Sequence, residues 1–458
     1  MTNRMKTKQT GWGTIVYRCL CPIALIGLTI PCEAQQTWSL SQCIDYAVEH
    51  NISVKQQDVT RLQREVDVNT AKNSRLPDLS ASASENFSFG RGLTAENTYT
   101  NTNTSSTSFS LGTSVPLFTG FRIPRTLELQ KLNLEAANAD LEKAKNDIRM
   151  QVAQAYVQIL YSMELCDVAR RQVSIDSLHV FRLKEMMKNG KASGTEVVQQ
   201  EAAMAQSKLT VTQADNDYRL ALLTLSQLLE LPSPEGFAIE RISPESLSLS
   251  SLTTLSPDAI YQEALLVKPE IQAEKYRLEG TEKSIEIAKS AKLPSLSFQA
   301  GMGSNYYKTS GFAAEGFFKQ LKNNFSQYLG LNLNIPLFNR FETRNNIKNA
   351  QLSQYQQQLQ LEQVKKGLYK EIQQAYYNAV ASQAKYESSS EAKRSQEEAF
   401  RLMTAKYEYG KANITEFNET KNNLMKAESD LARAKYEYLY QQALLDFYRG
   451  HDLSFQRP

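Results

Sequence analysis

The segment Gly330-Leu-Asn-Leu-Asn-Ile-Pro-Leu-Phe338 alternates apolar side chains with small or polar ones. With the preceding residue included, the apolar positions of the segment are Leu329, Leu331, Leu333, Ile335 and Leu337. A period of two residues is typical of a strand that has one apolar face and one wet face. A soluble sheet packed on a core alternates in the same way, so the meaning of the pattern depends on its recurrence.

The same alternation occurs in three further segments. They form two predicted strand pairs, residues 79–90 with 107–118 and residues 295–307 with 327–338. Each predicted strand has one apolar face and one face of small, polar residues. The polar segments inside the pairs, Arg91–Ser106 and Lys308–Ser326, favour long exposed hairpin loops.

The second half of the chain restates the first at an offset of about 216 to 220 residues. Leu76–Ser80 recurs as Leu293–Ser297, and Val115–Phe118 recurs as Ile335–Phe338. Several such matches in the same order indicate an internal duplication. We therefore divide the chain into residues 1–34, a first repeat over 35–240 and a second repeat over 241–458.

Each repeat is dominated by one very long helical segment. Residues 122–189 contain one proline and no glycine, which predicts a helix about 100 Å long at about 1.5 Å per residue. Residues 341–409 are its counterpart, and the apolar residues of both recur at spacings of three and four, as in coiled-coil seams. Glycines at 190 and 410 mark the turns after these helices.

Shorter helices are predicted to return along the long ones. Their lengths suggest that the helix 195–231 stacks end to end on 257–291, and that 413–449 stacks on 41–73. Prolines lie near the junctions between helices and strands, where a missing backbone donor ends regular structure. These junction residues, to which we assign no chemistry, are Pro77, Pro116, Pro294 and Pro336.

The first 34 residues predict a secretory signal peptide. Basic residues precede an apolar run from Leu20 to Ile30, and a cleavage site follows at Ala34. A membrane anchor and lipidation of Cys32 are the alternatives. The whole chain has 52 basic and 49 acidic residues. Removing residues 1–34 takes away four basic residues and one acidic residue, which leaves 48 of each. A neutral chain gives no reason to expect nucleic acid as a partner.

Four strands cannot close a membrane barrel, because the smallest such barrels have about eight strands. An open sheet with an apolar outer face cannot sit in lipid with unpaired edges. Several chains must therefore pool their strands, and the helices would continue the shared barrel as a tube. The arrangement predicts a conduit. A periplasmic coiled-coil scaffold or adaptor, in which the strands form a small soluble sheet, is the alternative.

Nearly all of residues 38–450 resembles the TolC-like outer-membrane efflux proteins. The resemblance is carried by the duplicated plan, by the Val/Ile-Pro-Leu-Phe motifs at 115–118 and 335–338, and by Tyr-x-x-Gly at 407–410. It implies an α+β, mostly α-helical homotrimer, in which each subunit lends four strands to a shared transmembrane β-barrel above a long periplasmic coiled-coil α-barrel. It also implies a location in the bacterial outer membrane and contact with its lipid.

The resemblance further implies a passive channel of a tripartite efflux or type I secretion system, with a gated periplasmic entrance. Its expected partners are a periplasmic adaptor and an inner-membrane pump or ABC-type exporter. No enzyme activity and no cofactor are expected, because the sequence has no nucleophile elbow or phosphate loop. The three histidines, His50, His179 and His451, lie far apart and form no metal motif.

The resemblance places the turns at Gly190 and Gly410 at the periplasmic tip, where an adaptor would dock. A plain helix cap is the simpler interpretation of each glycine. Glu416 and Glu419 lie three residues apart on one helical face, and with Tyr407 they match the periplasmic gate of the family. A solvated helix face is the alternative for the two glutamates. The gating arginine of the family is not matched, since Ala412 and Lys411 follow the turn.

Overall fold

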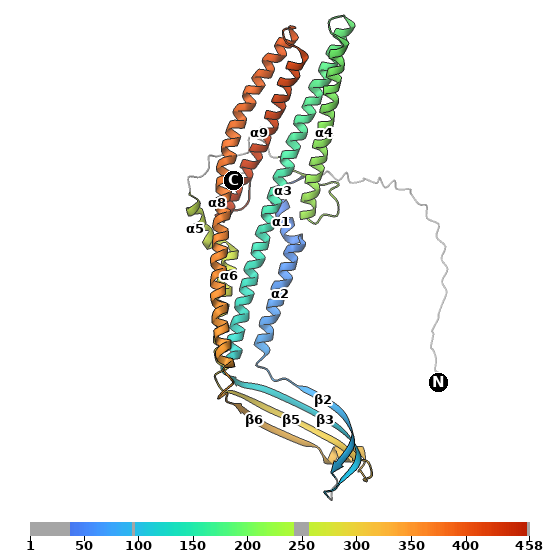
Figure 1. Ribbon diagram of the computed structural model, residues 1–458, viewed down its shortest axis with the longest axis vertical. Helices are drawn as coiled ribbons and strands as arrows, with labels where there is room; N and C mark the ends of the chain where they lie inside the picture. The colour runs from blue at the N-terminus through green and yellow to red at the C-terminus, as the bar shows by residue number, and fades with distance from the viewer. Residues whose placement is uncertain (1–36, 94–96, 242–255, 456–458) are drawn as a thin grey trace, which may run out of the picture.

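The structure is a computed structural model that describes residues 37–93, 97–241 and 256–455. It is an elongated body of long helices with a β-sheet at one end (Figure 1). The predicted signal peptide, residues 1–34 with Cys32, lies outside the described residues. Among the helices of the described ranges, none has a stretch long and apolar enough to cross a membrane.

The two repeats fold into matching sets of helices. The long helices α3 (Arg122–Lys188) and α8 (Glu342–Glu408) have 67 residues each, as the sequence predicted within about a residue at either end. Each is about 100 Å long at about 1.5 Å per residue. The remaining helices are α1 (Leu40–His50), α2 (Ile52–Asn73), α4 (Gly194–Leu228), α5 (Pro257–Val267), α6 (Pro269–Ser290) and α9 (Ile414–Tyr448).

The returning helices stack differently from the prediction. The start of α2 meets the end of α4, because the Asn51 amide donates to the Leu228 carbonyl at 3.0 Å. The start of α6 meets the end of α9, where the Lys268 ammonium lies 4.1 Å from the centre of the Phe447 ring. The predicted pairing of 195–231 with 257–291, and of 413–449 with 41–73, is therefore wrong. α2 and α6 have 22 residues each and α4 and α9 have 35 each, so length sums could not distinguish the two pairings.

The sheet has four antiparallel strands in the order β2-β3-β5-β6. Their bounds are β2 (Ser80–Leu93), β3 (Tyr99–Thr119), β5 (Ser295–Thr309) and β6 (Ser326–Asn334). Both predicted pairs are present, and the β3–β5 ladder joins the two repeats. This sheet is not closed on itself, since β2 and β6 are its edge strands.

The two faces of the sheet differ as predicted. On one face Leu111 is opposite Met302, and Phe298 is opposite Leu331. On the other face serines pair across β2 and β3, with Oγ–Oγ distances of 2.7 Å for Ser82 with Ser110 and for Ser84 with Ser108. We call the first of these the apolar face; its central members are Phe109, Leu111, Phe298, Ala300, Met302, Leu329, Leu331 and Leu333.

Two predicted loops are shorter or more ordered than expected. Most of Arg91–Ser106 belongs to the strands, because β2 runs to Leu93 and β3 begins at Tyr99. Threonine, asparagine and serine side chains suit a solvent-exposed strand as well as a loop. Their polarity alone therefore could not distinguish the two. The segment 308–326 contains a short helix, α7 (Phe317–Asn323). The predicted strand 327–338 is also shorter than expected. β6 ends at Asn334, so residues 335–338 are not strand.

The prolines mark the change from strand to helix, with one exception. Pro77 lies between α2 and β2, Pro294 directly precedes β5, and Pro336 lies between β6 and α8. Pro116 lies inside β3, where the register with β5 shifts between Pro116 and Phe118. A bulge tolerates the missing donor there.

The turn from strand to long helix has the same form in both repeats. Phe121 and Phe341, the residues before α3 and α8, both adopt left-handed backbone with φ of 67° and 64°. Each ring packs edge-on against the phenylalanine three residues earlier, Phe118 or Phe338. Left-handed backbone is unfavourable for a bulky residue, so its occurrence at equivalent positions supports the duplication.

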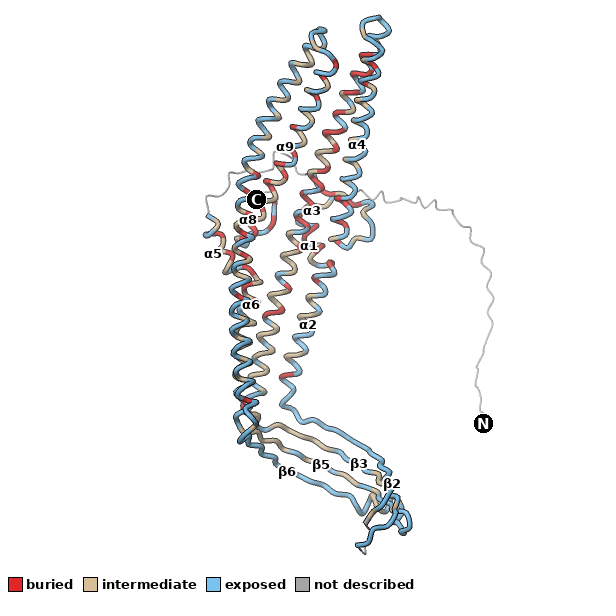
Figure 2. The backbone as a smooth tube through the Cα atoms, in the orientation of Figure 1, coloured by how far each residue is buried: buried red, intermediate tan, exposed pale blue. Residues whose placement is uncertain are grey.

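Buried residues gather at mid-height in the helical body and are sparse in the sheet (Figure 2). There the two-residue strands β1 (Thr37–Trp38) and β4 (Ala238–Ile239) pair in parallel, and the Tyr156 hydroxyl donates to the Glu240 carbonyl at 2.9 Å. The apolar face of the sheet, by contrast, is uncovered. Leu329 is 79% exposed and Leu331 is 68% exposed.

Candidate functional site

The two helical hairpins, α3/α4 and α8/α9, turn at the end of the molecule opposite the sheet (Figure 1). Gly190 and Gly410 stand one position beyond the helix caps with φ of +68° and +71°, a conformation that favours glycine. The next residue donates back to the helix in both turns, Lys191 to the Met186 carbonyl and Lys411 to the Lys406 carbonyl, each at 2.8 Å. The predicted helix caps are present, and the two turns are equivalent.

A capping box begins each returning helix. The Asn413 side chain accepts from the Glu416 backbone N–H at 2.9 Å, and the Glu416 carboxylate accepts from the Asn413 backbone N–H at 3.2 Å. Ser193 and Glu196 make the same reciprocal pair before α4. The acidic residue at this position therefore caps a helix in both repeats. Glu416 and Glu419 are both exposed to solvent in the single chain.

Just behind the turns, apolar side chains from all four helices meet. We call this the tip cluster; it consists of buried Leu183, Val197, Ile414 and Phe417 with the partly buried Ala192, Phe400 and Tyr407. Tyr407 lies with its ring centre 5.1 Å from that of Phe417. Burial, and to a lesser extent the negative charge of Glu196, raises the pKa of Tyr407 above its ordinary value. Tyr407 therefore packs between the hairpins as a neutral ring.

Below the tip cluster lies a closed ring of buried polar side chains, which we call the polar ring. Asp176 of α3 and Lys421 of α9 form an ion pair whose side chains are 0% and 2% exposed. Lys421 also donates to Asn418 at 3.2 Å. Asn418 donates to Gln200 at 3.1 Å, and Gln200 donates back to Asp176 at 3.1 Å.

The polar ring joins the two hairpins within one chain. Asp176 and Gln200 belong to α3 and α4, whereas Asn418 and Lys421 belong to α9. A third bond to the Asp176 carboxylate, from the Ser207 hydroxyl at 2.6 Å, completes its shell. A buried ion pair adds little net stability, but removing one partner leaves an uncompensated charge and is strongly destabilising. The hairpins can therefore separate here only if this pair becomes solvated.

Two exposed ion pairs, and a partly buried pair of Lys435 with Glu164 at 3.2 Å, also connect the hairpins. Arg182 of α3 lies 2.7 Å from Glu408 of α8, and Arg171 of α3 lies 3.3 Å from Glu428 of α9. All four side chains are at least a quarter exposed. Exposed pairs of this kind contribute about 0 to 1 kcal/mol. They orient the hairpins, which the tip cluster and the polar ring also join.

Sequence reasoning missed the polar ring, although a signal for it exists. Asp176 precedes the buried Val180 and Leu183 by four and seven residues, and Lys421 follows the buried Phe417 and Ile414 by the same spacings. Each charge therefore lies on the apolar stripe of its helix. Opposite charges at such positions on two helices predict a buried pair.

His179 is expected to make the tip sensitive to pH. Its buried ring lies 4.3 Å from that of Phe417, and burial, with the positive charges of Arg182 and Lys421, lowers its pKa; Asp176 and Glu408 oppose this shift. Because the unfolded state then binds the proton more readily, the tip should lose stability as the pH falls below about 6.5. The protection of the hairpin-end amides, measured as hydrogen exchange relative to the intrinsic rate at each pH, should fall on acidification, and His179→Gln should abolish much of that change. An equal response in the variant would contradict this assignment.

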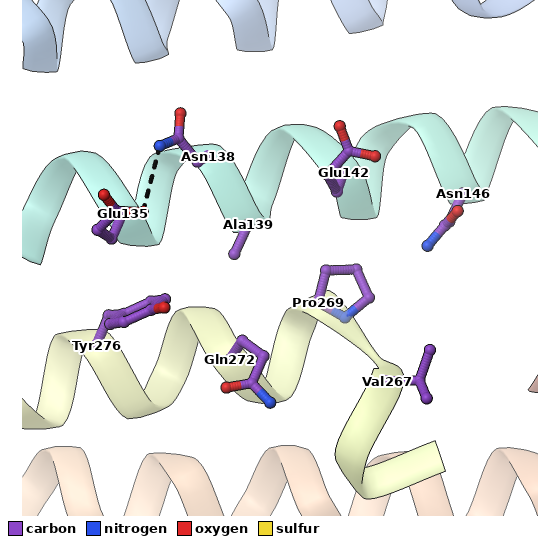
Figure 3. A pocket seen from close by; sticks show the side chains of 9 residues that line it. All are labelled: Glu135, Asn138, Ala139, Glu142, Asn146, Val267, Pro269, Gln272 and Tyr276. Atoms are coloured by element: carbon purple, nitrogen blue, oxygen red, sulfur yellow. Dashed lines mark hydrogen bonds between the residues drawn. The ribbon is translucent and has the colours of Figure 1, made fainter. Parts of the chain in front are cut away.

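A hollow of about 420 Å³ lies at mid-height, where α5 breaks into α6. Figure 3 shows Val267 and Pro269 at the break, near Asn146 of α3, while Tyr276 of α6 lies across from Glu135 at the other end of the hollow. It contains no arrangement of a nucleophile with a base. Across the described ranges there is also no group of three histidine, cysteine or acidic side chains that could hold a metal ion. The hairpin ends are thus the stronger candidate for a functional site.

A single chain thus combines long helical hairpins with an open-edged, one-sided sheet, an architecture of channel subunits in the outer membrane. Known proteins agree. The family model described as "Outer membrane efflux protein" matches residues 43–230 and 260–451. Outer membrane protein TolC of Vibrio cholerae is 21% identical over 318 residues, 69% of this chain and 70% of that protein. Protein CyaE of Bordetella pertussis is 23% identical over 425 residues, 91% and 83% of the two chains.

The fold is also that of a solved structure. The outer membrane channel CmeC of Campylobacter jejuni superposes with a TM-score of 0.74 at 18% identity, covering 91% of this chain and 86% of that chain. The chain belongs to the outer membrane efflux protein family. It is an outer-membrane channel protein of an efflux or type I secretion system, and its relatives are channels rather than enzymes. This finding favours the predicted channel over the scaffold.

Proposed function

We propose that three copies of this chain close a common barrel through their edge strands and form one continuous passive conduit. The observation that carries the proposal is the open sheet, whose apolar face is exposed and whose edges β2 and β6 are free in the single chain. Unpaired backbone groups are costly in lipid, so each β6 must pair with the β2 of a neighbour. Three copies of four strands exceed the minimum of about eight for a membrane barrel.

In this assembly the helical hairpins extend the barrel into the periplasm, and their turns surround the entrance. The polar ring and the tip cluster tie the two hairpins of each copy into one unit, which supports a gate that moves as whole hairpin pairs. Tyr407 contributes by packing between them. Glu416 and Glu419, exposed in the single chain, would place six carboxylates around the threefold axis. Such a ring attracts cations and repels anions.

The acidic entrance is tested by neutralising both residues. Glu416→Gln combined with Glu419→Gln should weaken block of the channel by divalent cations in planar bilayers. Glutamine also supports a capping box, so the fold of α9 should be unaffected. Glu196→Gln, at the equivalent cap of α4, is the matched control and should leave block unchanged. Identical block in the double variant and the parent would refute the assignment.

We further propose that the two hairpin turns dock a periplasmic adaptor, which connects the channel to an inner-membrane pump or ABC-type exporter. Both turns contain an exposed glycine with the same backbone geometry, so the same kind of adaptor surface can recognise either one. In addition, an added Cβ at Gly190 or Gly410 would meet no atom within 4 Å. A side chain introduced there would disturb docking through bulk and backbone strain, not through internal packing.

Replacing both glycines with valine should abolish pump-dependent export while the assembled channel remains in the membrane. Valine is strongly disfavoured at positive φ, so the turn must change shape. Export should be measured in cells, with heat-resistant assembly checked on the same samples. Gly316→Val, where a Cβ would also meet open space but φ is −58°, is the control at the opposite end of the molecule. Unchanged export in the double valine variant would disprove docking at the turns.

A further inference from the structure

The short helix α7, in the connection between β5 and β6, is tied to the sheet at the end farthest from the long helices. The Gln320 side chain accepts from the Tyr307 backbone N–H and donates to the Tyr307 carbonyl, both at 3.0 Å. Asn324 donates to the Asn305 carbonyl at 2.7 Å. These side chains occupy backbone groups of β5 beyond the end of β6, whose ladder stops at Ser326. The helix is therefore held in one place.

α7 lies on the apolar side of the sheet. The Ser304 hydroxyl donates to the Leu321 carbonyl at 2.5 Å, and the ring centres of Tyr306 and Phe317 are 5.1 Å apart. Residues 304 and 306 point to the same face of β5 as Met302, because alternate residues of a strand share a face. Phe325, just after α7, lines a shallow hollow with Phe109, Leu111 and Met302. The helix thus continues the apolar face toward the cell exterior.

Its own outer surface combines exposed rings with positive charge. Phe318 is 84% exposed and Phe325 is 51% exposed. Lys308, Lys319 and Lys322 are exposed around them, and Lys319 pairs at 2.5 Å with Glu315, which is the one acidic residue between 297 and 341. Bulky rings beside lysines are typical of a surface that rests at the boundary between acyl chains and headgroups. Free positive charge at that level favours anionic headgroups.

We propose that α7 is an interfacial lipid contact, in which Phe318 enters the acyl-chain boundary while Lys322 of α7 and Lys308 of β5 bind the phosphate groups of outer-leaflet lipid headgroups. Two observations select lipid as the occupant. The surface is continuous with the apolar face of the sheet, and its charge is complementary to phosphate. The inference rests on the proposed function only in that the apolar face must point toward lipid.

The test uses tryptophan as a depth probe in the assembled full-length protein, reconstituted into vesicles of phosphatidylcholine and phosphatidylglycerol. Phe318→Trp reports on α7 and Leu331→Trp on the apolar face. Phe181→Trp, with a native side chain 63% exposed on α3, reports on the periplasmic end. Emission of the parent, which retains Trp38 at mid-height, is subtracted. Lipids carry bromine either near the carbonyl end of the acyl chain or near its terminus.

The proposal predicts that Trp emission at position 318 is quenched by bromine near the carbonyl end and not by bromine at the chain terminus. The preference for quenching by brominated phosphatidylglycerol over phosphatidylcholine should fall several-fold when Lys308→Gln and Lys322→Gln are added. The probe at 181 should not be quenched at all. Together these results would support an anionic-lipid contact.

Three results would overturn the inference. Absence of quenching at 318 with quenching at 331 would mean that α7 faces water or a neighbouring subunit, while the barrel proposal stands. Absence of quenching at both positions would remove the barrel proposal as well. Quenching at 318 with the same lipid preference after both lysine substitutions would exclude the phosphate contacts.

Discussion

The Lys421→Met variant is expected to lose roughly 3 to 5 kcal/mol of stabilisation at the hairpin ends, because the Asp176 carboxylate stays buried without its cation. In the parent, that carboxylate is fully buried and also accepts from Gln200 and Ser207, neither of which carries a charge. The hairpins of each copy should separate locally so that water reaches Asp176. Hydrogen exchange of α3 and α9 near the tip should accelerate, and conductance in planar bilayers should rise.

Two control variants separate charge from packing. Asp176→Asn combined with Lys421→Met removes both charges; the new amide oxygen can accept from Gln200 while its NH2 group donates to the Ser207 hydroxyl, so it should recover most of the lost protection. Lys411→Met removes an exposed lysine from the adjacent turn and should change nothing in the ring. If Lys421→Met exchanged as slowly as the parent, the polar ring could not be what joins the hairpins.

Leu331→Arg should sharply reduce the amount of assembled channel in the outer membrane. Leu331 lies on the apolar face, opposite Phe298 and 68% exposed in the single chain. An arginine on the lipid side of a membrane barrel costs about 2 to 4 kcal/mol near the bilayer midplane, and the cost would apply in each copy. The measurement is the heat-resistant oligomer recovered from outer-membrane fractions.

The neighbouring residue provides a matched control. Asn332 is opposite Ser297 on the polar face, so Asn332→Arg places the same side chain toward water in the lumen. Near-normal assembly is expected, with altered conductance and ion selectivity. Equal loss of assembly in both variants would mean that the apolar face does not point toward lipid while the polar face points toward the lumen.

The regular parts of this fold could be predicted from the sequence because their signals are local and repeated. Alternation at Leu329, Leu331 and Leu333 predicted both the strand and its apolar face. The 67-residue helices followed from the absence of glycine and of internal proline in residues 125–188, and from matching periodicity in the second repeat. Gly190 and Gly410 marked the turns, where left-handed backbone is needed.

Features that depend on long-range contacts could not be predicted in the same way. The partner of α4 is α2 rather than α6, a choice made by contacts such as that of Asn51 with Leu228 and not by length. Glu416 was predicted at the gate by resemblance, yet its sequence position also makes it the third residue of a capping box. Its carboxylate bond to Asn413 leaves the charge in place, so the gate assignment stays a prediction.

The polar ring shows how a charge on an apolar stripe acquires meaning only through its partner. Asp176 alone could have been a solvated residue, and Lys421 lies 245 positions away in the sequence. Their pairing required the two repeats to place α3 beside α9. The duplicated plan makes that neighbourhood possible, because equivalent hairpins can pack side by side along their seams.

The central claim is that the four-stranded sheet is one third of a shared barrel. Electron cryomicroscopy of the full-length protein, extracted from outer membranes in mild detergent, tests it most directly. We predict a particle of three copies with a single twelve-stranded barrel, in which β6 of each copy pairs with β2 of the next, above one helical tube. A monomer, or an oligomer in which β2 and β6 stay unpaired between copies, would contradict the account.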